Sequence, residues 1–290
     1  MTTIKLNDRI PQKTAIALGI FDGVHCGHCL IINKACNYGL APAVFTFRSE
    51  SVKFKHGKPF EYIYTNNQKL HHFEKMGVEY VFSPDFDDIK NMTGEEFARD
   101  ILVKCMNAGA VVCGDNFRFG KNASCGVEEL EIFGLKYGFS VEVVKLRKND
   151  FSSEKFRIML KNGELSKENL YIFYGKVVHG NQIGRTINFP TINQGYSNGQ
   201  LVPKYGVYFT KTIIDGISYN SITNVGVKPT IVGERLPLAE THILDFSGDL
   251  YGRDIEVEFC KFIRLEMKFS SVDALKNQIS RDIAEVRSFI

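Results

Sequence analysis

Short apolar runs alternate with segments of helical periodicity over the first half of the chain. The apolar runs predict buried strands at residues 15–20, 41–47, 78–82, 110–114 and 141–146. The periodic segments predict helices at residues 27–39, 66–77, 93–107 and 127–138. Thr93 with Glu96 forms a capping box that opens the third helix. Strand–helix alternation implies parallel strands with right-handed crossovers, so the pattern predicts a doubly wound α/β sheet that binds ligands beyond the carboxyl ends of its strands.

The pattern changes near residue 165, where short strands separated by turns replace the strand–helix alternation. Strands are predicted at residues 174–180, 206–216, 217–226, 239–246 and 254–264, with Asp215-Gly216 as a hairpin turn. Residues 271–288 have apolar positions at helical spacing, namely Val272, Leu275, Ile279, Ile283 and Val286. We therefore predict a small antiparallel β-barrel with a closing C-terminal helix. A polar segment at residues 160–169 divides the chain into predicted domains of residues 1–160 and 161–290.

Composition and charge narrow the class of partner. Of the 290 residues, 44% are hydrophobic and 24% are charged, which is ordinary for a globular protein of two domains. The formal net charge is only +3, which argues against a nucleic-acid or membrane surface and suits small polyanions. Neither a membrane span of about 18 residues nor the apolar core of a signal peptide is visible. We expect a cytoplasmic protein that acts on small molecules without an obligate protein partner.

The most informative segment is FDGVHCGH, residues 21–28, which lies between a predicted strand and a predicted helix. Gly23 and Gly27 permit a tight turn and a close approach of the backbone to a ligand. His25 and His28 flank the start of the helix, whose free N–H groups and dipole attract phosphate. Two imidazoles there can donate hydrogen bonds to a triphosphate and stabilise the charge that develops when its α-phosphate is attacked. The segment therefore predicts catalysis by positioning and electrostatics, which needs no nucleophilic side chain.

Two other interpretations of this segment stay open. The histidines can be plain surface residues at the start of a helix. Cys26 and Cys29 also form a C-x-x-C pair interleaved with the histidines, a spacing that redox and zinc sites use. No second cysteine pair completes a zinc site in the sequence, and seven cysteines at irregular spacings are typical of reduced thiols in a cytosolic protein.

FDGVHCGH resembles the H-x-G-H signature of the nucleotidyltransferase superfamily, and in particular the FMN adenylyltransferase half of prokaryotic bifunctional FAD synthetases. VVCGDNFRFGKNASCG at residues 111–126 and SSEKFR at residues 152–157 are similar to two further motifs of that family. The resemblance implies a Rossmann-like domain that transfers AMP from ATP to FMN and releases pyrophosphate. It implies catalytic roles for His25, His28, Asn116 and Arg157. It also implies a set of ATP-binding residues, namely Gly19, Phe21, Asp22, Gly23, Gly27, Ser152 and Ser153.

Two departures from the family pattern bear on this first site. Glu154 stands where the family has Thr, and a carboxylate beside a triphosphate repels it unless it points away or is paired with Lys155. After the second strand, TFRSES at residues 46–51 keeps Thr46 and Phe47 but loses the rest of the family's Thr-Phe-x-Pro-His-Pro-like run. Both changes are expected to slow adenylyl transfer or to alter its substrate.

The β-rich half carries a motif of its own. YGKVVHGNQIGRTINFPTIN at residues 174–193 resembles the Gly-rich loop and Pro-Thr-Ala-Asn run of riboflavin kinases, and AETHILDF at residues 239–246 is similar to their Glu-x-His strand. The resemblance implies that Thr191 and Asn193 hold Mg²⁺ and phosphate, and that Glu240 is the general base for the ribityl hydroxyl of the flavin. It also implies that glycines cradle the ATP phosphates, namely Gly175, Gly180 and Gly184.

Departures in this second motif are smaller. Asn188 stands where a Gly is usual, and Ile192 replaces Ala between the two expected metal ligands. His179 and His242 are expected to pack or to bond locally rather than to catalyse.

The resemblance covers essentially the whole chain. It implies a bifunctional enzyme that phosphorylates riboflavin to FMN and adenylylates FMN to FAD, with ATP, riboflavin and FMN as substrates and Mg²⁺ as the metal. Three alternatives stay open: a single-activity relative in which one site has lapsed, a non-catalytic flavin or nucleotide sensor, and a nucleotidyltransferase that uses CTP.

Overall fold

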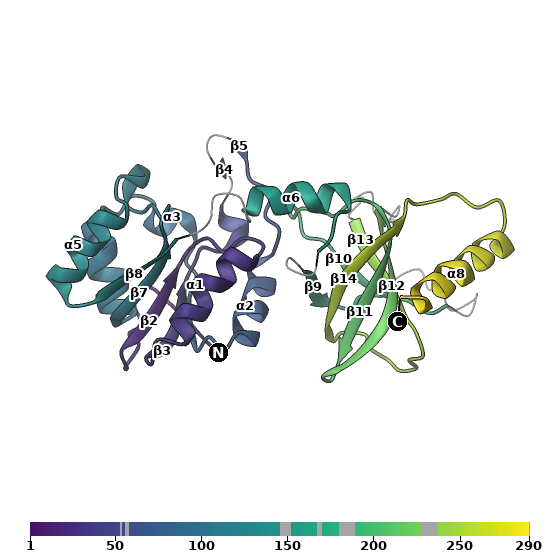
Figure 1. Cartoon of the computed structure of the whole chain (residues 1–290), viewed down its shortest axis with the longest axis horizontal. Coiled ribbons are helices and arrows are strands. Elements are labelled where there is room, and N and C mark those ends of the chain that lie inside the picture. Colours follow the sequence, from purple (N-terminus) through teal and green to yellow (C-terminus); the bar gives the residue numbers. More distant parts are fainter. Residues whose placement is uncertain are drawn as a thin grey trace. The chain divides into compact units, whose positions relative to one another are not determined.

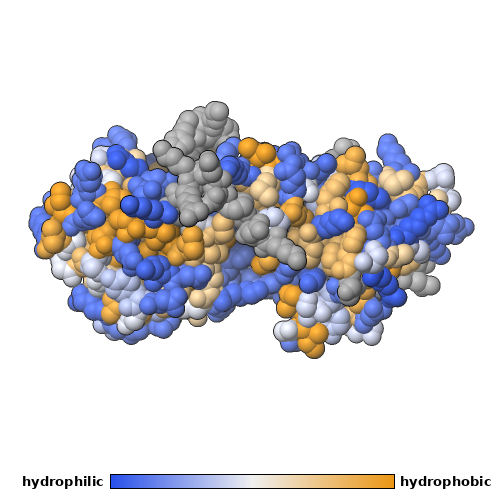
Figure 2. Space-filling view, in the orientation of Figure 1, coloured by the Kyte–Doolittle hydropathy of each residue, from blue (hydrophilic) through white to orange (hydrophobic). Residues whose placement is uncertain are grey.

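The computed structural model describes residues 1–52, 54–55, 58–145, 152–166, 170–179, 189–227 and 237–289. The chain divides into two compact units, Met1–Ser153 and Glu154–Ile290, and the division falls before the boundary predicted at residue 160. On both units, apolar surface occurs as patches among hydrophilic residues (Figure 2). No helix of the described residues is long and apolar enough to span a bilayer.

The first unit is built on a parallel six-stranded sheet of order β1-β6-β3-β2-β7-β8. Its strands are β1 (Thr2–Ile4), β2 (Thr14–Leu18), β3 (Ala41–Phe45), β6 (Tyr80–Phe82), β7 (Ala108–Gly114) and β8 (Ser140–Val144). The predicted doubly wound sheet is therefore confirmed. The hydropathy pattern does not predict β1, because only Ile4 of its residues is buried.

Helices lie on both sides of this sheet, and α1 packs on β2, β3 and β7 (Figure 1). They are α1 (Cys26–Cys36), α2 (Asn66–Lys75), α3 (Phe86–Ile89), α4 (Gly94–Glu96) with its continuation η2 (Phe97–Cys105), and α5 (Val127–Tyr137). The short elements are η1 (Ser49–Ser51), β4 (Phe54–Lys55), β5 (Lys58–Pro59) and η3 (Lys121–Ala123). The predicted capping box is confirmed, since Thr93 Oγ1 accepts from the Glu96 amide at 3.2 Å and Glu96 Oε2 accepts from the Thr93 amide at 2.8 Å.

The second unit is a nearly closed antiparallel barrel that follows α6 (Ser153–Asn162). Its strand order is β10-β13-β12-β11-β14-β9, and a bridge between Val178 and Asn193 joins the two ends of the sheet. The strands are β9 (Tyr171–Lys176), β10 (Ile192–Gly195), β11 (Gly206–Ile214), β12 (Ile217–Val227), β13 (Pro237–Ile243) and β14 (Asp254–Arg264). Asp215 and Gly216 form the predicted hairpin turn, with φ angles of 50° and 81°.

Helix α8 (Val272–Arg287) covers part of the outer face of the barrel, as predicted (Figure 1). Ile283 and Val286 pack against an outer cluster that includes Val207, Phe209 and Ile222. Val272, at the first predicted apolar position, is instead 56% exposed. In addition, the Asp282 carboxylate of α8 accepts hydrogen bonds from the Arg264 guanidinium of β14, including one of 2.7 Å from Nη2. A buried ion pair therefore helps to hold the helix in place.

A chain of hydroxyl groups crosses the barrel from β11 through β12 to β13. Neighbouring hydroxyls in this chain lie 2.8–2.9 Å apart, and each of their residues is fully buried. The order along the chain is Thr212, Ser221, Thr210, Thr223 and Thr241. Because buried hydroxyls are costly when they lack partners, this chain satisfies polar groups that an apolar barrel would not tolerate.

Replacing Thr223 by Val is expected to destabilise the barrel unit by about 1–3 kcal/mol, because Thr210 and Thr241 each lose a buried partner. Urea unfolding of the full chain measures the change. Thr223→Ser keeps the hydroxyl and is the control, with a smaller loss expected. Equal stability of Thr223→Val and the unmodified chain would contradict the importance of the hydroxyl chain.

Candidate active sites

The turn between β2 and α1 has an unusual backbone. Phe21 and Val24 have φ angles of 50° and 37°, and Gly23 between them has a φ angle of 84°. Positive φ is uncommon for non-glycine residues and is an outlier for a β-branched residue such as Val. Strained backbone of this kind costs about 1–3 kcal/mol per residue and persists only where surrounding contacts enforce it. The turn at the carboxyl end of β2 is therefore a specific, enforced structure.

Two histidines stand together at the end of this turn. The rings of His25 and His28 are stacked, with centroids 3.7 Å apart, and the Phe21 ring meets the His28 ring edge-on at 5.3 Å. His25 is the N-cap residue of α1, and its side chain makes no cap hydrogen bond. The first backbone N–H groups of the helix and the imidazoles therefore lie at one place, which suits a polyphosphate.

Hydrogen bonds to Asp22 hold the turn from two directions. Asp22 is buried, and its Oδ1 accepts from the backbone amides of Ile63 and Tyr64 at 2.8 and 3.4 Å. Its backbone carbonyl accepts from Ser153 Oγ at 2.9 Å. The structure thus brings the third motif of the sequence, at Ser153, onto the first.

The two other residues expected to be catalytic in the first site, Asn116 and Arg157, lie in different units. Asn116 is exposed in the turn after β7, which is the neighbour of β2 in the sheet. It therefore stands at the same edge of the sheet as the histidine turn, as the parallel topology requires. Arg157 is buried on α6 and belongs to the second unit, where its Nη1 lies 3.6 Å from Glu154 Oε2.

The barrel places Asn193 and Glu240 directly opposite each other. Asn193 of β10 pairs in antiparallel register with Glu240 of β13, and Glu240 pairs in turn with Asn224 of β12. Directly opposite residues of such a pair project from the same face with Cβ atoms about 4.5–5.5 Å apart. Segments that are almost 50 residues apart in the sequence therefore supply one polar row across three strands.

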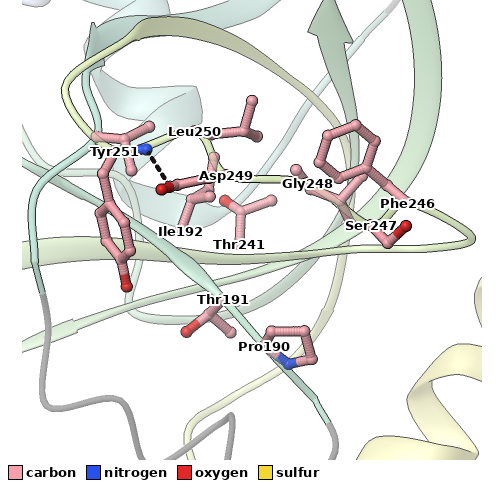
Figure 3. Close-up of a pocket in the computed structure, with 12 residues that line it drawn as sticks. Pro190, Thr191, Ile192, Thr241, Phe246, Ser247, Gly248, Asp249, Leu250 and Tyr251 are labelled. Atoms are coloured by element: carbon pink, nitrogen blue, oxygen red, sulfur yellow. Dashed lines mark hydrogen bonds between the residues drawn. The ribbon is translucent and has the colours of Figure 1, made fainter.

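Beside this row lies a cavity of about 260 Å³, lined by Thr191 and by the segment that joins β13 to β14 (Figure 3). Its walls are largely apolar and aromatic, with Ile192, Phe246 and Leu250 among them. Figure 3 also shows the hydrogen bond from the Tyr251 amide to Asp249 Oδ1, which measures 3.0 Å. A mainly apolar cavity with a few polar groups is the usual form of a small-molecule site.

The residues expected to hold a metal fit a hard cation. Asn193 is only 4% exposed, and its Oδ1 has no hydrogen-bond partner among the described residues. A buried amide oxygen without a partner is costly, so a ligand for this atom is expected. Carbonyl and hydroxyl oxygens are ligands that Mg²⁺ accepts, and the Thr191 side chain lies two residues before Asn193 on the same strand segment.

Comparison with known proteins identifies a family model for each of the two units. Residues 7–155 match the model of the FAD synthetase family, and residues 167–290 match that of the riboflavin kinase family. A bifunctional riboflavin kinase/FMN adenylyltransferase of Haemophilus influenzae is 35% identical, and the match covers 97% of this chain and 96% of the relative. The one of Bacillus subtilis is 32% identical, with 94% and 91% covered.

The chain belongs to the bifunctional riboflavin kinase/FMN adenylyltransferase family. The family and the pair of activities expected from the sequence motifs are therefore confirmed. Among solved structures, the crystal structure of a macrolide-efflux protein from Streptococcus pneumoniae is similar over 99% of this chain and 98% of its own, with a TM-score of 0.79 and 28% identity.

The structure brings most of the predicted residues together within each unit, while their roles stay predictions. Gly19, Phe21, Asp22, Gly23 and Gly27 all lie at the end of β2 or at the start of α1, with the histidines of this FAD synthetase unit. Ser152 is exposed just before α6. In the riboflavin kinase unit, Gly175 lies on β9, where its carbonyl accepts from Gln194 Nε2 at 2.6 Å. Gly180 and Gly184 lie outside the described residues.

The structure describes the surroundings of three of the four sequence departures from the family motifs. Glu154 is highly exposed, and its Oε2 lies 3.6 Å from Arg157 Nη1, so its charge is paired with this guanidinium rather than with Lys155. In the TFRSES segment, the retained Thr46 is fully buried and donates a 2.7 Å hydrogen bond to the carbonyl of Ile20. Ile192 lines the cavity beside Thr191. Asn188, the fourth departure, lies outside the described residues.

The histidines of the riboflavin kinase unit bond and pack locally, as expected. The ring of His179 stacks on Tyr251 with centroids 3.9 Å apart. His242 Nδ1 lies 2.8 Å from the carbonyl oxygen of Pro190, to which it can donate. Both contacts attach neighbouring segments to the walls of the cavity, because Pro190 and Tyr251 line it.

The Cys29 thiol next to the histidine turn does not have the character of a reactive cysteine. All seven cysteines are free, and burial together with the neighbouring Cys26 raises the pKa of Cys29. A raised pKa lowers the thiolate fraction, and thiolate is the reactive form. Within the described ranges, no group of three or more His, Cys, Asp or Glu side chains could hold a metal.

Two features of the sites have no motif in the sequence. One is the buried Lys69 of α2, which bonds to the end of β2. A lysine in an amphipathic helix ordinarily indicates a solvated face, so the pattern does not reveal it. The other is the cavity wall at residues 246–251, which only the closure of the barrel brings beside Thr191.

Gly19→Ala is expected to destabilise the FAD synthetase unit by about 1–3 kcal/mol, because it overpacks the turn. A Cβ at Gly19 would lie 2.8 Å from ring atoms of Phe21, whose ring contacts His28. Thermal unfolding measures the loss. The matched control is Gly195→Ala, where the new Cβ would be 3.8 Å from Leu238 and little change is expected. Equal unfolding temperatures of the two variants would contradict this prediction, because they would show that the Phe21 ring moves aside at little energetic cost.

Proposed function

We propose that this chain makes FAD from riboflavin in two ATP-dependent steps, one in each unit. One observation supports the proposal above all: each family model matches one compact unit, and each unit has a polar site of its own. The site of the first unit is the histidine turn, and that of the second is the pair of Asn193 and Glu240. Both families use ATP and typically a divalent metal.

In the first unit, the proposed reaction is adenylyl transfer to FMN. A phosphate oxygen of FMN forms a bond to the α-phosphorus of ATP, and the bond from that phosphorus to pyrophosphate breaks. His25, His28 and the first N–H groups of α1 donate hydrogen bonds to the phosphate oxygens, where negative charge increases in the transition state. Loss of one such donor typically costs a factor of about 100–1,000 in rate.

Asn116 and Arg157 are the other two residues expected to act in the first reaction. Asn116 stands at the same edge of the sheet as the histidine turn and is assigned to the phosphates and the flavin. Arg157 is assigned to the leaving pyrophosphate, because a guanidinium is permanently charged and binds phosphate through two parallel hydrogen bonds. Ser152 and Ser153 are assigned to ATP, with Ser153 already bonded to the backbone of the turn.

In the second unit, the proposed reaction is phosphoryl transfer to riboflavin. Glu240 takes the proton of the terminal ribityl hydroxyl, whose oxygen bonds to the γ-phosphorus of ATP while ADP leaves. Thr191 and the buried Asn193 Oδ1 hold Mg²⁺ in this proposal. When bound, the metal neutralises charge on the polyphosphate. The cavity beside Thr191 then takes the adenine ring of ATP, because its walls are apolar and partly aromatic.

An assay of the purified chain with ATP and Mg²⁺, run separately on riboflavin and on FMN, tests the two-step proposal. FMN is expected from riboflavin and FAD from FMN, both detected by chromatography. Formation of only one product would mean that one site has lapsed. Tight flavin binding without turnover would favour a sensor, and a preference for CTP would exclude the proposed first reaction. The cytoplasmic location and the lack of an obligate protein partner stay predictions.

Single substitutions separate the two sites in the same assay. His28→Ala is expected to lower FAD formation about 100–1,000-fold and to leave FMN formation unchanged. Glu240→Gln is expected to lower FMN formation about 100–10,000-fold, because the amide cannot accept the proton, and to leave FAD formation unchanged. In each variant, the activity that is expected to stay unchanged shows that the protein is folded. Loss of both activities in either variant would refute the assignment of one activity to each unit.

The magnesium assignment has its own test. Asn193→Ala is expected to raise the Mg²⁺ concentration that half-saturates riboflavin phosphorylation by at least about tenfold, because an oxygen ligand is lost. The Mg²⁺ dependence of FAD formation in the same protein is the control and should not change. An unaltered Mg²⁺ requirement for riboflavin phosphorylation would remove Asn193 from the metal site.

A further inference from the structure

A lysine is buried beneath the histidine turn. Lys69 of α2 is 1% exposed, and its ammonium group donates to three oxygens: the carbonyl of Ile20 at 3.2 Å, Thr46 Oγ1 at 3.0 Å and the carbonyl of Phe47 at 2.5 Å. An ammonium group has three donors, so every one of them is used. Few charged side chains are buried to this degree, and those that are need complete hydrogen bonding.

The three acceptors lie at the carboxyl ends of two adjacent strands. Ile20 follows β2 and directly precedes the strained residue Phe21, whereas Thr46 and Phe47 follow β3. Thr46 Oγ1 also donates to the carbonyl of Ile20 at 2.7 Å, so this carbonyl accepts from both Thr46 and Lys69. Lys69 and Thr46 therefore fix the point at which the chain leaves the sheet and enters the histidine turn.

Two carboxylates face the buried ammonium group. Asp22 of the turn and Glu50 of η1 both interact with it electrostatically, although burial is the larger effect and lowers the pKa of Lys69 to about 8. Asp22 also holds the amides of Ile63 and Tyr64, which precede α2. The turn and the segment containing α2 are therefore joined twice, once through a buried carboxylate and once through a buried ammonium group.

We propose that Lys69 is a positioning residue for adenylyl transfer: its ammonium group, bonded to the ends of β2 and β3, sets the turn that places His25 and His28. The proposal rests on the proposed function of the first unit. A strained turn needs bonds that enforce it, and Lys69 supplies the bond on the strand side just as Asp22 supplies those on the α2 side. Within the TFRSES segment, Thr46 takes part through its side-chain hydroxyl and Phe47 through its backbone carbonyl.

A neutral Lys69 would support the turn less well. The uncharged amine has only two donors, so one of the three oxygens loses its bond when the proton leaves. The charged form predominates below a pH of about 8 and the neutral form above it. Adenylyl transfer is therefore expected to decline as the pH rises through about 8, and the second unit, which has no part in these bonds, should not show this decline.

The test compares Lys69→Met with Lys75→Met in the full-length chain. Methionine keeps the length of the side chain and removes the charge, and Lys75 is an exposed lysine on the same helix. At a temperature where circular dichroism shows both variants folded, Lys69→Met is expected to lower kcat for FAD formation about a hundredfold, as misplacement of catalytic groups by about 1 Å does. Lys75→Met should behave as the unmodified chain does, and FMN formation should be unchanged in both.

The pH profile supplies a second readout that does not depend on the variants folding. Between pH 7 and 9.5, the ratio of FAD formation to FMN formation in the unmodified chain is expected to fall with a midpoint near pH 8. Forming the ratio cancels effects of pH on ATP and Mg²⁺, which both reactions share. In Lys69→Met the residual ratio should not change across this range.

Two outcomes would overturn the proposal. One is a folded Lys69→Met variant with an unaltered kcat and only a lower unfolding temperature, which would make Lys69 a purely structural residue. The other is a flat pH ratio in the unmodified chain. Failure of the proposed function is distinguishable from both, because then the unmodified chain would form no FAD, or His28→Ala would form it at the normal rate.

Discussion

The first site depends on a turn that its own backbone does not favour. Phe21 and Val24 have positive φ angles, which cost about 1–3 kcal/mol each and must be offset by contacts. Asp22 and Lys69 provide such contacts, with backbone amides bonded to the carboxylate and carbonyls at the strand ends bonded to the ammonium group. Because His25 stands at the end of the turn, these buried bonds lie next to the site that is predicted to bind phosphate.

In the barrel, Asn193 takes part both in the closure of the sheet and in the predicted metal site. Asn193 makes the bridge to Val178 that joins the ends of the sheet, and it also stands opposite Glu240. Its backbone carbonyl accepts from the Val178 amide in this bridge, and its buried amide oxygen has no hydrogen-bond partner among the described residues. The hydroxyl chain through Thr223 ends at Thr241, which pairs with Ile192 and lines the cavity, so it stabilises the barrel next to this bridge.

Much of the fold could be predicted because the signals are local. Apolar runs and helical periodicity identify the central strands and helices, Thr93 with Glu96 identifies a cap, and Asp215-Gly216 identifies a hairpin. The parts of the fold that the sequence pattern did not predict correctly also have physical reasons. β1 and β10 are too short to show alternation, and Val272 occupies an apolar helical position that is nevertheless 56% exposed.

The two-unit architecture, the family and motif residues such as His25, His28 and Glu240 can be predicted from the sequence alone, because each depends on short-range patterns that are recognisable without knowledge of contacts. The folded structure is needed to show that Asn193 faces Glu240, that Ser153 reaches Asp22 and that Lys69 lies buried beneath the turn. These pairings join residues far apart in the chain. Strand register and helix packing set them, and neither is encoded in the spacing of residues along one segment.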